Sequence, residues 1–351
     1  MCGRYALALR PSDVRQMLED DDMPVGESPG DDTGASPRST YNFAPGYFGL
    51  VYRANDSGSQ SDAKESTGST DSLTTGPQDN TRTTSYKMQS MKWGLIPSWT
   101  KRNPNYSTML KTINCRDDSL ATPGGMWSSM KAHKRCIVLA QGFFEWLQVG
   151  PKSKVPHYVK RKDGRLMCIA GLWDSVQYEG SETKTFTYTI ITTDSNKQLK
   201  FLHSRMPVIL EPNSDALWTW LDPRRRIWSK ELQTTLKPFS GELEVYPVHQ
   251  DVGKVGNNSP AFVRPLDDAR NKSNIVHFFK SKPLDNIKPD ESKKRAVATE
   301  TGDFDEIRKK PRLSTGTGGA NFQKLGGNLT GNLAFETNCK GKITGFFDKK
   351  T

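Results

Sequence analysis

The chain has few cysteines, a low apolar content and no long apolar run, and each shortage excludes a class of protein. Its five cysteines and five histidines show no CxxC, HExxH or C2H2 spacing, so neither a disulfide framework nor a metal site is expected. No stretch approaches the roughly 18 apolar residues of a membrane-spanning helix, and no apolar signal-peptide core begins the chain. We therefore expect a soluble, reduced, intracellular protein that uses no metal or other cofactor.

Apolar residues make up only 34% of the chain, which indicates that part of it is not packed into a core. Residues 55–85 are almost without bulky apolar side chains, and residues 19–38 are acidic and rich in Gly and Pro. We interpret both as disordered insertions within one folded domain, residues 1–280. Residues 281–351 are predicted to form a disordered basic tail.

Strand-like segments dominate the predicted domain. Residues 134–146, 165–178 and 184–195 combine β-branched and aromatic residues between polar boundaries. Helical patterns are fewer: one follows Ser12 as a candidate cap, and the others cover residues 214–222 and 229–237. Because strands and helices do not alternate regularly, the sequence predicts a single α+β domain built on a curved, barrel-like, largely antiparallel sheet with flanking helices.

The charge is strongly basic, with 50 Lys and Arg against 39 Asp and Glu and a formal net charge of +11. The two expected insertions are acidic, so the remaining body is more basic still. Such a body favours a polyanionic partner, nucleic acid above all. A basic surface that merely keeps the protein soluble is the alternative.

The opening MCGRY places a cysteine second in the chain. Removal of Met1 would give Cys2 a free α-amine next to its thiol, two groups whose reference pKa values are about 8 and about 8.5. Such a pair captures an aldehyde, first as an imine and then as a thiazolidine ring closed by the thiol. A cysteine at this position can also be a coincidence.

Four further segments accompany this N-terminus, and together the five resemble the SOS-response-associated peptidase (SRAP) family over roughly residues 1–280. They are MCGRY (1–5), MKWGLIPSW (91–99), TINCRDD (112–118), GFFEW (142–146) and HSRMPVIL (203–210). The resemblance implies that the mature Cys2 attacks the ring-opened aldehyde of an abasic site in single-stranded DNA and forms a thiazolidine cross-link, shielding the lesion.

The resemblance also implies roles for three further catalytic residues. Glu145 would orient and deprotonate the Cys2 amine, and His203 would transfer a proton at the sugar hydroxyl during ring opening. Asn114 would hold the N-terminus and the sugar. Taken alone, each residue has a plainer interpretation: a solvent-facing strand glutamate, a satisfied histidine and a turn asparagine.

The arginines Arg4, Arg116 and Arg205 match positions at which the family contacts DNA, and their forked guanidinium groups suit phosphate. Each lies within two residues of a proposed catalytic group. A phosphate contact at each arginine is therefore expected.

The remaining expected DNA contacts come from two other segments. YNFAPG resembles the family segment beside the DNA and contributes Asn42 and Pro45, with Gly46 in a slot that is often polar. Trp93 is a candidate for stacking on an exposed base, with core packing as the alternative. Trp99 we interpret as structural.

The internal cysteines are rivals to Cys2 as nucleophiles. Cys115 lies inside the TINCR motif, yet it lacks an α-amine and no histidine is close in sequence, so we interpret it as a packing residue. Cys136 and Cys168 lie in apolar strand segments and are expected to be buried.

Two signals are present in the tail. The basic clusters 293–295 and 308–312 resemble a bipartite nuclear localisation signal. At the C-terminus Ile343, Phe346 and Phe347 have the spacing of a peptide that binds the sliding clamp PCNA, although Lys340 replaces the usual glutamine. A nuclear location and a possible clamp partner follow as expectations.

We therefore predict a nuclear, monomeric DNA-damage protein that cross-links to abasic sites with lyase-like chemistry and has no membrane partner. One alternative is a non-covalent reader of single-stranded or hydroxymethylcytosine-containing DNA. Another is a thiol peptidase, in trans or on its own N-terminus.

Overall fold

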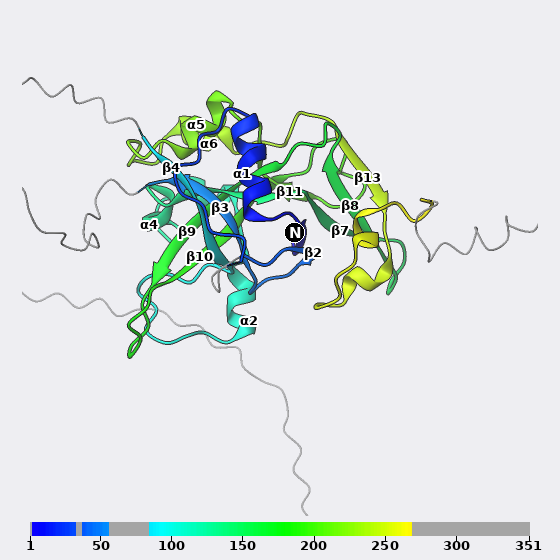
Figure 1. Ribbon diagram of the computed structural model, residues 1–351, viewed down its shortest axis with the longest axis horizontal. Helices are drawn as coiled ribbons and strands as arrows, with labels where there is room; N and C mark the ends of the chain where they lie inside the picture. Colours follow the sequence, from blue (N-terminus) through cyan, green and yellow to red (C-terminus); the bar gives the residue numbers. More distant parts are fainter. Residues whose placement is uncertain (1, 33–36, 56–83, 269–351) are drawn as a thin grey trace, which may run out of the picture. The chain divides into compact units, whose positions relative to one another are not determined.

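The computed structural model describes residues 2–32, 37–55 and 84–268, all of which belong to one compact unit, Met1–Asp285 (Figure 1). A second unit, Asn286–Thr351, lies outside the described residues. The described part contains two largely antiparallel sheets and several short helices, which confirms the expected α+β class. The barrel-like sheet is one of these two sheets.

Five strands of the larger sheet close into a ring. β3 pairs with β4 and β6, β6 pairs with β9, and β9 pairs with β10, all antiparallel. The ring closes because β10 also pairs in parallel with the end of β4. Closure leaves no open edge between these strands. Their bounds are β3 Phe48–Ala54, β4 Tyr86–Trp93, β6 Arg135–Ala140, β9 Met167–Val176 and β10 Thr185–Asp194.

Three short strands extend this sheet: β5 Asn114–Arg116, β11 Arg205–Pro207 and β12 Ile209–Leu210. β5 pairs in parallel with β10, and β11 pairs antiparallel with the same end of β10. The segments TINCR and HSRMP are therefore brought together at β10, although they are far apart in sequence.

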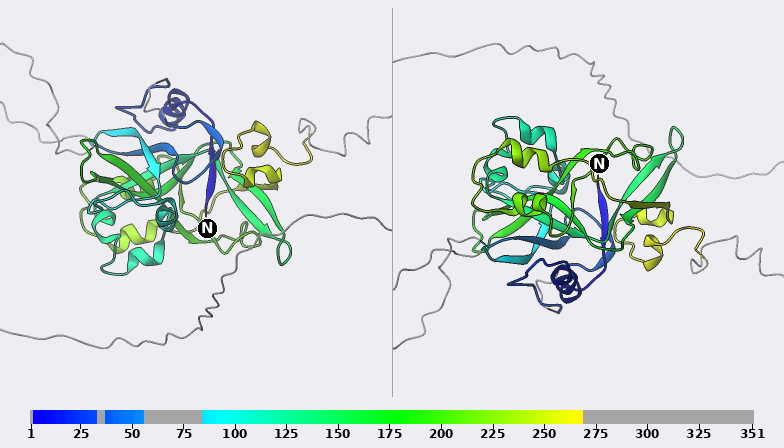
Figure 2. Two further views of the ribbon diagram at one scale, coloured as in Figure 1. Left: turned by 90° about the horizontal axis from the view of Figure 1, so that it is seen from below. Right: turned by 90° about the horizontal axis from the view of Figure 1, so that it is seen from above.

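The second sheet is fully antiparallel and has the strand order β13-β8-β7-β1-β2. Both views of Figure 2 show β1 between the barrel strands and the β7–β8 hairpin. The strand that carries the N-terminus is therefore an inner strand of its sheet. The bounds are β1 Arg4–Leu7, β2 Thr40–Phe43, β7 Gly142–Gln148, β8 Lys154–Arg161 and β13 Leu243–Pro247.

Residues 134–146, expected as one strand, form two strands that belong to different sheets. β6 ends at Ala140 and β7 begins at Gly142. Between them Gln141 donates its backbone N–H to the carbonyl of Ala6 and accepts the N–H of Ala8 at its side-chain oxygen, 2.7 Å away. This corner moves the chain from the barrel to the second sheet, an effect that strand propensity alone does not reveal.

The expected helices are present, with one correction at the first cap. α1 (Pro11–Asp20) begins at a proline, and Asp13 accepts the N–H of Arg10, the residue before the helix. Ser12 is not the cap: its hydroxyl donates to Asp31 at 2.7 Å. Ser214 and Ser229 cap α5 (Asp215–Leu221) and α6 (Lys230–Thr235) as their sequences predict.

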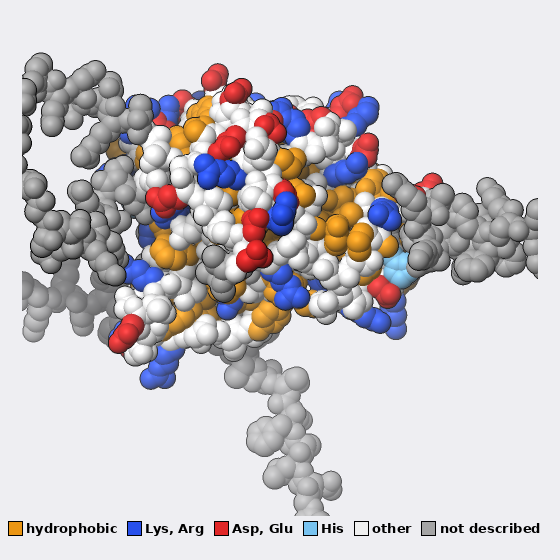
Figure 3. Space-filling model, in the orientation of Figure 1, with side chains coloured by type: hydrophobic (Ala, Val, Ile, Leu, Met, Phe, Trp, Pro, Cys, Tyr) orange, Lys and Arg blue, Asp and Glu red, His pale blue; other side chains and the backbone are white. Residues whose placement is uncertain are grey.

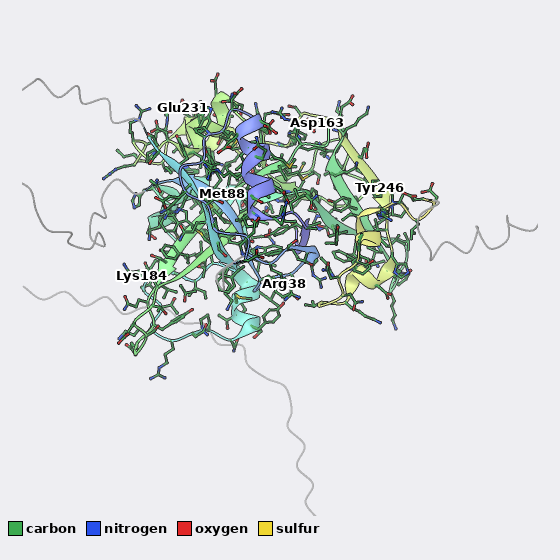
Figure 4. All side chains as sticks on the ribbon, in the orientation of Figure 1. Arg38, Met88, Asp163, Lys184, Glu231 and Tyr246 are labelled. Atoms are coloured by element: carbon green, nitrogen blue, oxygen red, sulfur yellow. The ribbon has the colours of Figure 1, made fainter. Side chains whose placement is uncertain are left out.

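Shorter helices complete the described part. They are α2 Tyr106–Met109, α3 Asp117–Ala121 and α4 Ser128–Lys131, with the 3-10 turns η1 Leu110–Thr112, η2 Gln250–Gly253 and η3 Pro260–Val263. Tyr246 of β13, labelled in Figure 4, donates its hydroxyl to the carbonyl of Val263 at 2.8 Å. This bond ties the last described turn to the second sheet.

The acidic segment 19–38 differs from the disordered insertion that we expected, because its described residues are anchored. Met23 and Val25 are buried in the core. Asp21 accepts from Arg165 at 2.8 Å, which fixes the turn after α1 to the region before β9. Two apolar side chains in an otherwise acidic stretch are enough to pin it. Residues 33–36 lie outside the described part, as do residues 56–83 of the second expected insertion.

A pair of buried tyrosines joins the two sheets. The hydroxyls of Tyr5 on β1 and Tyr188 on β10 lie 2.5 Å apart, and both side chains are fully buried. Gly49 faces this pair, and a Cβ there would collide with both hydroxyls and with the ring of Phe43. The close approach explains the glycine and holds the start of the chain against the barrel.

Candidate active site

Cys2 lies two residues before β1, and its side chain is buried, with 1% of its surface exposed. Its thiol donates to the carbonyl of Arg4 at 3.8 Å. Burial, and after it the negative charge of Glu145, raises the pKa of the thiol from 9.0 to about 12. The thiol is therefore protonated at neutral pH, and Glu145 is close enough to act on it electrostatically.

Asn114 is the direct partner of the N-terminal backbone. Its amide nitrogen, Nδ2, donates to the carbonyl of Cys2 at 2.8 Å. Its amide oxygen, Oδ1, is buried and has no hydrogen-bond partner within the described residues. An unsatisfied buried acceptor is costly. This oxygen is therefore suited to receive an N–H or O–H group from the mature N-terminus or from a substrate.

Glu145 lies on β7, the strand next to β1, with the register Arg4 opposite Phe144. Its side chain is buried, with 9% exposed, and Oε1 accepts the N–H of Trp146 at 3.3 Å. The expected alternation holds in part: Phe144 is fully buried in a small cluster on one face, whereas Glu145 points to the other face and toward Cys2.

His203 precedes β11 and is half-buried. Its Nδ1 lies 3.0 Å from the backbone nitrogen of Arg205 and 3.2 Å from the carbonyl oxygen of the same residue. The backbone of Arg205 thus orients the ring through Nδ1.

These four residues belong to elements that adjoin one another. Asn114 binds Cys2 directly, and its strand β5 shares β10 with β11, which follows His203. On the other side, Glu145 lies opposite His157 in the β7–β8 pair, and the ring of His157 meets the ring of Phe201, two residues before His203. Asn114 and Glu145 therefore reach Cys2 from two different sheets.

Arg4 and Asn42 form an internal brace. Nη1 of Arg4 donates to Oδ1 of Asn42 at 2.7 Å and to the carbonyl of Val252 at 2.9 Å. Nδ2 of Asn42 donates to the carbonyls of Lys254 and Asn257, both at 3.0 Å. Through these hydrogen bonds Arg4 and Asn42 hold the turn at residues 252–257, and Asn42 itself is almost fully buried. A direct DNA contact by Asn42 does not fit this placement.

Pro45 is buried, and the turn that it begins needs the glycine that follows. Gly46 has φ +88° and donates its N–H to the carbonyl of Trp93 at 2.8 Å. Gly46 therefore meets a backbone requirement of this turn. Pro45 shapes the turn rather than presenting a surface.

Arg116 and Arg205 differ in their availability. Arg116 is exposed and pairs with the exposed Asp118. Arg205 is 8% exposed, and its guanidinium is held by Asp117 at 2.7 Å and by Asp194 at 3.1 Å. Arg116 can exchange its partner for a phosphate at little cost. The phosphate contact predicted for Arg205 remains a prediction, and its contacts favour a positioning role.

The interpretation of the two tryptophans is reversed by the structure. Trp93 is fully buried, packs against Tyr5 at a centroid distance of 5.1 Å and donates its indole N–H to the carbonyl of Ile113. Trp99 has 57% of its surface exposed. Trp93 ends β4 with its side chain turned into the barrel, so the base-stacking role expected for it is wrong. Trp99 follows the strand and faces solvent.

Sequence reasoning missed His157 and Phe201. His157 is buried on β8, opposite Glu145, and its Nδ1 lies 3.0 Å from the carbonyl of Val155. Phe201 meets the His157 ring at 6.3 Å and 77°. The turn residues Gly150 and Pro151 between two strand-like runs were the available signal, because a hairpin there sets the register that pairs Glu145 with His157.

The other described cysteines, Cys115, Cys136 and Cys168, are free and buried. Burial raises the pKa of the Cys115 thiol far above its ordinary value, with Asp117 as the next cause, so this thiol is a poor nucleophile. The packing roles expected for all three agree with this burial.

The charge on the surface is mixed where it is visible. On the face shown in Figure 3, Lys and Arg side chains are interspersed with Asp and Glu. Among the described residues no group of three or more His, Cys, Asp and Glu side chains is arranged to hold a metal ion, and no helix there is long and apolar enough to cross a bilayer. The tail motifs, residues 293–312 and 340–350, lie outside the described part.

Comparisons with known proteins give matches over much of the chain. A family model described as SOS response associated peptidase (SRAP) matches residues 1–255. The abasic site processing protein YMR114C of Saccharomyces cerevisiae is 35% identical over 287 residues, which cover 76% of this chain and 68% of the yeast protein. The abasic site processing protein HMCES of Gallus gallus is 31% identical over 51% of this chain and 58% of its own length.

A bacterial relative and a solved structure extend the comparison. The abasic site processing protein YoqW of Bacillus subtilis is 34% identical over 50% of this chain and 76% of its own length. A crystal structure of a protein from Bacteroides thetaiotaomicron is 29% identical, with a TM-score of 0.46 over 51% of this chain and 77% of that chain.

Proposed function

The chain belongs to the SOS response associated peptidase family, and from this premise we propose that it processes abasic sites in DNA through a covalent cross-link at Cys2. The lesion carries an aldehyde, and Cys2 without Met1 carries an amine and a thiol. The observation that supports this function best is the hydrogen bond from Asn114 to the carbonyl of Cys2, next to the buried carboxylate of Glu145. Together these residues hold the reactive end of the chain beside an acid–base group.

The raised pKa of the thiol sets the order of the steps. An α-amine has a reference pKa of about 8, whereas burial raises the pKa of the Cys2 thiol to about 12. The amine therefore attacks first. Its nitrogen bonds to the aldehyde carbon, the carbinolamine loses water, and an imine results. The S–H group then adds across the imine: sulfur bonds to carbon, the proton moves to nitrogen, and a thiazolidine is complete.

Three side chains serve these steps in the proposal. Glu145 accepts the proton that the α-ammonium group must lose before it attacks. His203, oriented through Nδ1, exchanges a proton at Nε2 with the sugar hydroxyl as the closed sugar ring opens. The unsatisfied Oδ1 of Asn114 accepts a hydrogen bond from the amine or the sugar. The lyase-like character of the activity resides in this imine chemistry.

Cross-linking is tested with an oligonucleotide that carries one abasic site, resolved on a denaturing gel. Intact mass first establishes that Met1 has been removed. The processed protein is expected to give one retarded, heat-stable band. Cys2→Ala keeps the α-amine and loses the thiol, so it should give a band only when the imine is trapped with borohydride. Cys115→Ala, a buried cysteine outside the proposed chemistry, should behave as wild type.

Two results would contradict the proposal. A stable band with Cys2→Ala in the absence of borohydride would remove the thiol from the reaction. No band with processed wild-type protein would leave either a non-covalent reader of single-stranded or modified DNA, or a peptidase as the family description names it. Binding to an unreactive abasic analogue would identify the reader, and Cys2-dependent cleavage of a peptide would identify the peptidase.

Nuclear localisation and clamp binding are part of the same proposal and rest on the sequence of the tail alone. The basic clusters 293–295 and 308–312 and the apolar trio Ile343, Phe346 and Phe347 carry them. A PCNA pull-down with Phe346→Ala and Phe347→Ala combined tests the clamp. Retention of binding in this double variant would exclude the motif.

A further inference from the structure

Phe201 is a large apolar side chain that the fold keeps at the surface. Of its surface 57% is exposed, although two leucines of the same turn are buried. Leu199 and Leu202 point into the core, with 2% and 5% exposed. Because the inward positions are taken by these leucines, Phe201 is directed outward by the turn itself.

The turn that carries Phe201 is rigidly held. The backbone N–H groups of Leu202 and His203 both donate to the carbonyl of Leu199, at 2.9 and 3.1 Å. Asn196 accepts the N–H of Leu199 at its side-chain oxygen and donates to the carbonyl of Phe239 at 2.9 Å. The outward direction of Phe201 is thus a fixed feature of the fold.

On one side the ring of Phe201 contacts a buried side chain. The ring contacts His157 at 6.3 Å between centroids and 77° between planes, an edge-to-face arrangement. His157 is itself buried, and its Nδ1 is bound to the carbonyl of Val155 at 3.0 Å. Phe201 therefore rests on a firm support while most of its own surface stays open.

The surroundings suit a nucleic acid strand. Lys197 and Lys200 are exposed on the same turn, and neither forms an ion pair within residues 2–32, 37–55 and 84–268. Two residues beyond Phe201 is His203, which the proposed function assigns to the sugar of the lesion. An exposed aromatic ring flanked by unpaired lysines is the composition that binds single strands, with bases on the ring and phosphates at the lysines.

From these observations we propose that Phe201 is a stacking site for the nucleobase next to the abasic residue, with Lys197 and Lys200 beside its phosphates. The inference rests on the proposed function, because it takes the position of the lesion from His203. Stacking would hold the strand on one side of the missing base. The lesion, which has no base of its own, would then be positioned by its neighbour.

Binding is measured with the full-length protein by fluorescence anisotropy, using a labelled single strand that carries a tetrahydrofuran residue, an abasic analogue without an aldehyde. Stacking on an aromatic side chain contributes about 1–3 kcal/mol per base, so Phe201→Ala should weaken binding by about tenfold. Phe201→Tyr keeps the ring and should bind within about twofold of wild type. Ile227→Ala removes another exposed apolar side chain, 82% exposed, and is the matched control.

A second pair of probes identifies the base. In each, the nucleotide on the 5′ or the 3′ side of the analogue is replaced by a spacer without a base. The loss caused by Phe201→Ala should disappear with one of the two spacers and persist with the other. Wild-type affinity for Phe201→Ala would overturn the inference, as would an equal loss with both spacers.

The two proposals fail in different ways. The cross-linking gel uses a true abasic site and does not depend on Phe201. If wild type cross-links and Phe201→Ala binds normally, only the stacking site is wrong. If Phe201→Ala loses affinity for one probe but wild type gives no covalent band, the stacking site stands and the chemistry of Cys2 is wrong.

Discussion

Replacing Arg205 and Arg116 by glutamine tests whether Arg205 is structural and Arg116 contacts DNA. Arg205→Gln leaves Asp117 without its cation, in a place where that carboxylate is only 19% exposed and otherwise accepts from Thr193 at 2.8 Å. Breaking a buried ion pair costs about 3–5 kcal/mol. The pair with Asp194 adds little, because Asp194 is 84% exposed. The loss should be about 3 kcal/mol.

A loss of this size is readily measured by thermal unfolding. For a folded unit of this length, 1 kcal/mol corresponds to about 2–4 °C, so Arg205→Gln should melt about 6–12 °C lower. Arg116→Gln removes only an exposed pair and should melt within about 2 °C of wild type.

The dependence of DNA affinity on salt gives the opposite pattern. Each phosphate contact on a single strand contributes about 0.7 to the slope of log K against log salt. Arg116→Gln should flatten the slope by about this amount. Arg205→Gln should leave the slope unchanged at temperatures at which this variant is folded. An Arg205→Gln protein that melts like wild type and has the flatter slope would refute the reasoning and restore Arg205 as a direct phosphate contact.

Two further predictions concern the core. Burial raises the pKa of the Cys168 thiol from 9.0 to about 12, so the folded protein keeps a proton that the unfolded chain loses, and the free energy of unfolding falls as the pH rises above about 9. Between pH 8 and pH 10 this thiol accounts for a loss of about 1.4 kcal/mol, so in urea titrations under reducing conditions Cys168→Ala should lose that much less stability than wild type. An equal loss in both proteins would count against this prediction. Trp93→Ala should cost about 3–5 kcal/mol, whereas Trp99→Ala should stay within about 0.5 kcal/mol, and the reverse order in denaturant midpoints would contradict the assignment of the buried tryptophan.

Sequence patterns were sufficient where the physics is local. The structure has the serine caps at Ser214 and Ser229, which follow from capping chemistry. It also has the strands over 165–178 and 184–195, which follow from their β-branched and aromatic residues between polar boundaries. The chemistry proposed for Cys2 also rests on a local feature, an amine and a thiol on adjacent carbons, and it stays a prediction.

What sequence reasoning could not give depends on which face of a strand is covered. Trp93 and Trp99 lie six residues apart in one motif, and only the barrel decides that the first is buried and the second exposed. Asn42 was expected at the DNA and instead binds backbone carbonyls of a turn more than 200 residues away, at Lys254 and Asn257. Long-range partners of this kind leave no mark in a local pattern.

The position of Cys2 just ahead of an inner strand would resolve a difficulty of using a chain terminus as a reagent. Terminal residues ordinarily fray, and a mobile amine would forfeit most of the rate that a fixed geometry gives. Here β1 is paired on both sides, by β2 and β7, and Asn114 fixes the carbonyl of Cys2 itself. The amine of a processed Cys2 would therefore be held nearly as firmly as a core residue while remaining chemically a terminus. In the proposed reaction the same burial, which raises the pKa of the thiol to about 12, would keep it protonated until an imine forms beside it. The fixed geometry of the amine, and the sequence in which amine and thiol react, would thus both follow from the position of β1 in its sheet.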